Sequence, residues 1–167
     1  MIDALILWLE GTRVSSFMIT SSWAWPVVES FHFVGLTLLV GVIGLFDLRL
    51  MGVAKSISPR ALHRLVPFGV LGFLINVTTG SMFVAGTPDQ YLGGNAAFEF
   101  KMVFMTMAGL NVGAFYLTSS TKLKELGPGD DFPWSAKLIG AISLTLWLAI
   151  ITCGRLITFY RPTFVVF

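Results

Sequence analysis

Charged residues are scarce in this sequence: Asp, Glu, Lys and Arg together make up 12% of its 167 residues. A soluble domain of ordinary composition carries about 25%. Hydrophobic residues make up 55%, and the mean hydropathy is +0.81. The composition therefore argues against a soluble enzyme and predicts one integral-membrane domain over residues 1–167. The net charge of +2 is too small to indicate a nucleic-acid partner.

Cysteine is almost absent, since Cys153 is the only one. A single cysteine excludes an intramolecular disulfide and any multi-cysteine zinc or iron–sulfur site. The sequence also has no phosphate-binding glycine loop and no Ser–His–Asp set, which argues against a hydrolase or an ATP-driven machine. No Lys or Arg precedes Arg13, so we expect no secretory signal peptide. We therefore favour a non-catalytic or electron-transfer subunit over a stand-alone enzyme.

Long apolar runs, in contrast, are plentiful. Four of them are long enough to cross a bilayer as helices; they cover about 24–46, 67–85, 98–117 and 135–159. Before the first run, residues 2–18 carry a shorter apolar cluster that Glu10 and Gly11 interrupt, which predicts an amphipathic helix at the membrane surface. The fold class is therefore an all-α membrane protein, a bundle of four spans with an N-terminal interfacial helix. In the third span, Gly109 and Gly113 form a small-xxx-small pattern that favours close helix packing.

Basic residues indicate the orientation of the spans. The connections after the first and third spans, with their flanks, hold most of the basic residues: Arg49, Lys55, Arg60, Arg64, Lys122, Lys124 and Lys137. The other side has Arg13, Lys101, Arg155 and Arg161. This bias predicts a multi-pass protein of the bacterial cytoplasmic (inner) membrane with both termini in the periplasm.

Two ionisable residues, Glu29 and His32, lie inside the first apolar run. Three positions apart on a helix, they share one face. An ionisable group in a span is costly, so it usually faces the interior of the bundle and a partner. By helix rise, His32 lies about 12 Å below the outer surface.

The same count brings polar or sulfur-bearing residues of the other spans to that depth. The second span contributes Thr78 and Thr79, and the third contributes Met105 and Thr106. One turn nearer the outside come Glu29 and Arg155, with Lys101 at the mouth. One interpretation of Glu29 and Arg155 is an ion pair that joins the first span to the fourth. The alternative is that Arg155 and Lys101 neutralise an acidic group such as a haem propionate, with Glu29 orienting a ligand or carrying protons.

His32 is a candidate axial ligand of a b-type haem, and Gly35 one turn further in would let a flat macrocycle approach the backbone. The other histidine, His63, lies on the order of 20 Å from His32 along the membrane normal, which is too far for a bis-histidine site. A second ligand within the chain would have to be Met105 or Met102. The alternatives are a hydrogen-bonding role for His32 in the helix bundle, and a quinone or proton site.

Residues of the first span also resemble those of a known group of membrane proteins. Its residues Trp25-Pro26, Glu29-Ser30, His32, Gly35-Leu36, Gly41 and Phe46-Asp47-Leu48-Arg49-Leu50-Met51-Gly52 are similar to an uncharacterised family of small bacterial integral-membrane proteins, a domain of unknown function. The resemblance covers nearly the whole chain and implies fold and location but no activity. A weaker, architectural similarity runs to four-helix b-type cytochromes, which typically use two histidines.

These observations lead to a principal hypothesis and two alternatives. The principal one is a small inner-membrane subunit that holds haem b for electron transfer through His32, with Met105 as the second ligand within the chain and with Glu29, Gly35, Lys101 and Arg155 around the haem. It would act beside other membrane subunits or as a homo-oligomer. The first alternative is a structural or assembly subunit whose polar cluster locks the bundle. The second is a quinone or proton-coupled small-solute site.

Overall fold

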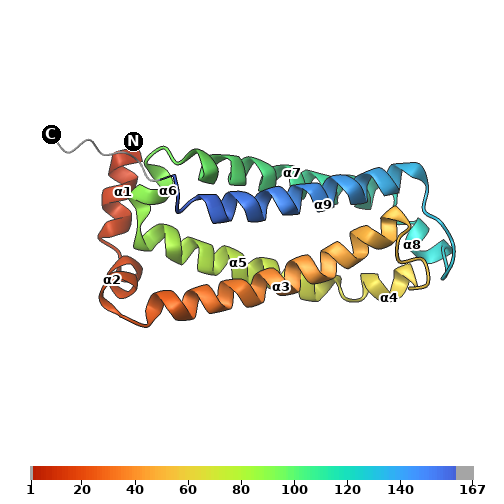
Figure 1. Ribbon diagram of the computed structural model, residues 1–167, viewed down its shortest axis with the longest axis horizontal. Coiled ribbons are helices and arrows are strands. Elements are labelled where there is room, and N and C mark those ends of the chain that lie inside the picture. Colours follow the sequence, from red (N-terminus) through yellow and green to blue (C-terminus); the bar gives the residue numbers. More distant parts are fainter. Residues whose placement is uncertain (1, 161–167) are drawn as a thin grey trace.

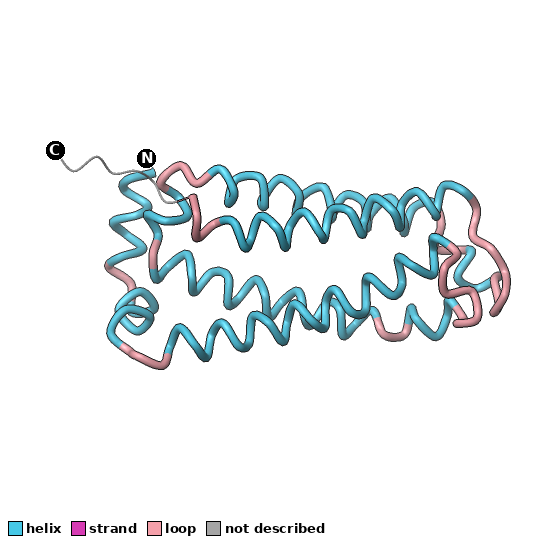
Figure 2. The backbone as a smooth tube through the Cα atoms, in the orientation of Figure 1, coloured by secondary structure: helices cyan, strands magenta, loops and turns pink. Residues whose placement is uncertain are grey.

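The structure is a computed structural model that describes residues 2–160, apart from the side chain of Lys124. Within these residues all regular secondary structure is helical (Figure 1). The helices are α1 (Ile2–Glu10), α2 (Arg13–Thr20), α3 (Ala24–Met51), α4 (Pro59–His63), α5 (Val66–Gly86), α6 (Pro88–Leu92), α7 (Ala96–Thr118), α8 (Lys122–Glu125) and α9 (Trp134–Leu156). Figure 2 shows that the loops gather at the two ends of the long helices.

Four of the helices in residues 2–160, α3, α5, α7 and α9, are long and apolar enough to cross a membrane. This confirms the all-α membrane fold and the four predicted spans. The bounds differ most at α3, which continues to Met51 instead of ending near Phe46. It continues because the side chains of its last turns, including Asp47 and Arg49, are buried against other parts of the chain.

The long helices pack in a definite order. Helix α3 packs against both α5 and α9, and α9 packs against α7. Figure 1 shows α3 and α9 approaching each other at the end that carries α4 and α8 and diverging toward the end that carries α1, α2 and α6. Gly140 permits the approach, because a Cβ at this position would lie 2.9 Å from the carbonyl oxygen of Asp47. We call these two ends of the bundle the α4/α8 end and the α1/α6 end.

Helices α3 and α5 cross at two facing glycines. A Cβ at Gly72 would lie 2.5 Å from the carbonyl oxygen of Gly35, and one at Gly35 would lie 2.9 Å from that of Gly72. The backbones therefore touch, as small residues allow in membrane helices. The expected close approach at Gly109 and Gly113 is not found within the described chain, where no neighbouring atom comes within 4 Å of a Cβ built on either residue.

The predicted single helix over residues 2–18 is instead two helices, α1 and α2. The break falls at Gly11 and Thr12, where the Thr12 hydroxyl accepts a hydrogen bond from the Ser15 backbone N–H and caps a new helix. Helix α2 packs on α5, and its Met18 is fully buried beside Trp25 and Gly86. The N-terminal segment therefore covers the α1/α6 end of the bundle.

Candidate functional site

The best-defined feature near the α1/α6 end is the contact between His32 on α3 and Thr79 on α5. The Nδ1 atom of His32 lies 2.7 Å from the Thr79 hydroxyl oxygen, and that oxygen lies 2.7 Å from the carbonyl oxygen of Ile75. A hydroxyl has one proton to donate, and the Ile75 carbonyl can only accept. We therefore infer that Nδ1–H of His32 donates to Thr79. This contact confirms the depth count that placed Thr79 level with His32.

The tautomer decides what the other ring nitrogen can do. With the proton on Nδ1, a neutral His32 presents a lone pair on Nε2. The ring is half-buried and lies edge-on to Phe83, with ring centroids 5.5 Å apart. Within residues 2–160, no hydrogen-bond donor reaches Nε2. A histidine that is oriented by a hydrogen bond through Nδ1 and open at Nε2 has the arrangement that metal-ligating histidines use.

The second feature is Lys101, a charged residue on α7. Its side chain lies against α9, with Nζ 3.6 Å from the position of a Cβ at Gly154. Among the described residues no carboxylate forms an ion pair with Lys101. Lys101 is therefore a half-buried cation that could neutralise an acidic group.

The ion pair between Glu29 and Arg155 is not present in the structure. Both residues are exposed, and the Arg155 guanidinium carbon lies 5.8 Å from the ring centroid of Phe159. The interpretation that this pair joins α3 to α9 is therefore wrong. Their predicted roles beside a ligand stay predictions.

Gly35 and Met105 both pack against other parts of the bundle. Gly35 is covered by Gly72, Ile75 and Asn76 of α5, so its missing side chain serves helix packing. Met105 is half-buried and packs against an apolar cluster of Leu39, Ala108, Leu146, Trp147 and Ile150. No group of three or more His, Cys, Asp or Glu side chains within residues 2–160 could hold a bare metal ion.

No protein-family model, curated protein or solved structure matches this chain. The resemblance to a bacterial membrane-protein family and to b-type cytochromes therefore stays a prediction.

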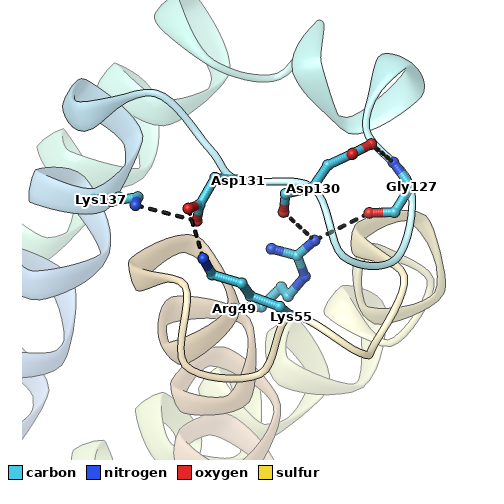
Figure 3. A network of polar contacts seen from close by, with 6 residues as sticks. All are labelled: Arg49, Lys55, Gly127, Asp130, Asp131 and Lys137. Atoms are coloured by element: carbon cyan, nitrogen blue, oxygen red, sulfur yellow. Dashed lines mark hydrogen bonds and ion pairs between the residues drawn. The ribbon is translucent and has the colours of Figure 1, made fainter.

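Sequence reasoning missed the fully buried Arg49 in the last turn of α3, treating it only as a charge that ends the span. Its guanidinium donates to three carbonyl oxygens: Nε to Ile57 at 2.8 Å, and one terminal nitrogen to Asp130 at 2.9 Å and Gly127 at 3.2 Å. Ile57 lies in the connection between α3 and α4, whereas Gly127 and Asp130 lie in the connection between α8 and α9, so Arg49 joins the two connections. Figure 3 shows the bonds to Gly127 and Asp130.

An exposed ion-pair network surrounds Arg49. Asp131 binds Lys55 at 2.6 Å and Lys137 at 3.1 Å, as Figure 3 shows. The hydrogen bonds from Lys55 and Lys137 lower the pKa of the Asp131 carboxyl below its ordinary value. Because the network is exposed, its contribution to stability is small. Arg49, in contrast, is fully buried and makes hydrogen bonds at this end, while its other terminal nitrogen has no partner among the described residues.

Proposed function

We propose that this protein holds a b-type haem through Nε2 of His32 and serves electron transfer as a small membrane subunit. The single observation that carries the proposal is the hydrogen bond from His32 Nδ1–H to Thr79, which leaves a lone pair inside an apolar span without a partner among the described residues. An unsatisfied polar atom in such surroundings is costly. A ligand at Nε2 would remove that cost.

The residues around His32 fit a haem in two respects. Thr79 fixes the ring orientation, and Lys101 on α7 is a cation that has no acidic partner within residues 2–160. A bound haem would supply one-electron redox chemistry, while Lys101 would neutralise a propionate. Met105 stays the proposed second ligand within the chain; otherwise the second ligand comes from a partner subunit or a second copy.

A quinone is the second candidate ligand, because the same two groups suit it. Nε2 of His32 could accept a hydrogen bond from a quinol hydroxyl, and Lys101 could donate to a quinone oxygen. A quinone gives no haem absorption, so a thermal shift on adding quinone to colourless protein would identify this alternative. The structural alternative keeps the His32–Thr79 hydrogen bond as a link between α3 and α5, whereas the Glu29–Arg155 pair is absent among the described residues.

We predict that His32→Ala removes the haem signal of the purified protein and that Thr79→Val lowers haem affinity about 10- to 100-fold, as loss of an orienting partner does for other ligands. The matched control is Thr78→Val, because Thr78 is exposed and donates only to Leu74 of its own helix. Haem content per protein, read from absorbance, measures the effect. Full haem content in His32→Ala would exclude His32 as an essential ligand.

We further propose that the protein lies in a bacterial cytoplasmic membrane with both termini in the periplasm. Arg49, Lys55, Arg60 and Lys137 all lie in or beside the connections at the α4/α8 end, which supports a cytoplasmic location for that end. In a Cys153→Ser background, we predict that a cysteine at Lys122 reacts only from the cytoplasmic side and one at Gln90 only from the periplasmic side. Labelling of both positions from one side would overturn this topology.

A further inference from the structure

A second site is built around Asp47, in the last turns of α3. This carboxyl is 3% exposed, and its Oδ2 has no hydrogen-bond partner in the described part of the chain. None of the ion pairs within residues 2–160 involves it. Arg49, two residues further on, donates instead to the connections. A carboxylate buried in this way, without a cation, is unfavourable unless something neutralises it.

The surroundings of Asp47 leave room for water. A cavity of about 60 Å³ is lined by Asp47 of α3, Asn111 of α7 and Ser143 of α9, among apolar residues such as Ile43 and Phe46. The Asn111 side-chain nitrogen donates to the carbonyl oxygen of Ile139 at 3.0 Å, which leaves its side-chain oxygen able to accept. A cavity of this size with several polar atoms meets the requirements for holding ordered water.

An open groove at the α4/α8 end adjoins the cavity. Val66 and Tyr116 line both the cavity and an open groove that also includes His63, Arg64 and Pro67. At the mouth, Nε2 of His63 lies 3.1 Å from the Tyr116 hydroxyl. Water in the groove beside His63 would therefore reach the cavity of Asp47 past Val66 and Tyr116, which line both spaces.

We propose that Asp47 is a proton-binding site that exchanges protons with the water at the α4/α8 end through this cavity. A hydronium ion transfers its proton to the carboxylate and leaves as water, and the reverse step releases the proton. The titratable groups at the cavity or its mouth are His63 of α4, Tyr116 of α7 and Arg64, whereas α9 contributes only the neutral Ser143. The site lies at the end of the bundle opposite His32 and does not depend on haem.

The test is infrared spectroscopy of the full chain in lipid vesicles near neutral pH, in H₂O and after exchange into D₂O. A protonated carboxyl has a C=O stretching band separate from the amide bands. We expect this band in the wild type, its loss in the nearly isosteric Asp47→Asn, and its retention in Asp131→Asn, which removes an exposed carboxylate. We also expect the band to shift in D₂O, because the proton exchanges with bulk water.

Two results would overturn the proposal. One is a spectrum in which Asp47→Asn removes no carboxyl band, so that Asp47 carries no proton. The other is a band that belongs to Asp47 but does not shift in D₂O, so that no water reaches it. Should Asp47→Asn fail to fold, Ser143→Ala keeps the carboxyl and should shift its stretching frequency, because the neighbouring hydroxyl is lost. An unshifted band in folded Ser143→Ala would then assign it to another carboxyl and contradict the proposal.

Discussion

Arg49→Ala is expected to be among the most destabilising single substitutions in the chain. Arg49 is fully buried, donates to three carbonyl oxygens and lies 5.5 Å from the ring centroid of Phe132. Its removal leaves the carbonyls of Ile57, Gly127 and Asp130 without this donor, which we expect to cost on the order of 3 kcal/mol or more. Arg49→Lys should be intermediate, because an ammonium keeps the charge but not the planar arrangement of donors.

The matched control is Arg64→Ala, which removes an exposed arginine at the same end of the bundle. Substitution of such a surface residue should change the free energy of unfolding by less than about 0.5 kcal/mol. Thermal unfolding in detergent measures the global effect, and limited proteolysis of residues 119–133 measures release of the connection that Arg49 binds. Equal unfolding temperatures and equal cleavage rates for the two variants would contradict the role assigned to Arg49.

Gly72→Ala is expected to be the second large effect. A Cβ at Gly72 would lie 2.5 Å from the Gly35 carbonyl oxygen and 2.7 Å from the Leu39 backbone nitrogen. Both neighbours are backbone atoms of α3, so relief requires the two helices to move apart. Overpacking of this kind costs about 1 to 3 kcal/mol. Because Thr79 lies two turns along α5, the movement should also weaken its hydrogen bond to His32.

Gly80→Ala is the control on the same helix, because no neighbouring atom lies within 4 Å of a Cβ built there. An alanine with open space around it should be neutral or stabilise by up to about 1 kcal/mol, since alanine favours helix over glycine. Thermal unfolding of the two variants in one detergent compares them directly. If Gly80→Ala destabilised as much as Gly72→Ala, the loss would come from the added methyl group itself and not from the α3–α5 contact.

The spans could be predicted from the sequence because they depend on one physical requirement, an unbroken apolar length that satisfies its own backbone hydrogen bonds. The depth of Thr79 relative to His32 followed from helix rise alone. Which helix faces which could not be derived in this way. By composition, close packing suits four glycines equally: Gly35, Gly72, Gly109 and Gly113. Only the folded structure shows that the first two touch another helix.

The α4/α8 end was harder to predict, because hydropathy assigns charged residues to water. Asp47 and Arg49 follow a long apolar run, and the predicted span therefore ended before them, at about residue 46. The structure buries both, one beside a cavity and the other against carbonyl oxygens that come from distant connections. Such partners lie up to about eighty positions away in the chain, so no local pattern reveals them. The one signal in the sequence that the helix continues past Phe46 was a helical pattern that persists through Leu50.

The most direct test of the haem proposal is the difference between the dithionite-reduced and oxidised visible spectra of protein purified in mild detergent from cells supplied with haem. The account predicts the sharp reduced bands of a b-type cytochrome in the wild type and in Thr78→Val, and their absence in His32→Ala. A flat difference spectrum from folded wild-type protein purified together with its native partners would contradict the proposal. His32 would then serve as a hydrogen-bonding link between α3 and α5.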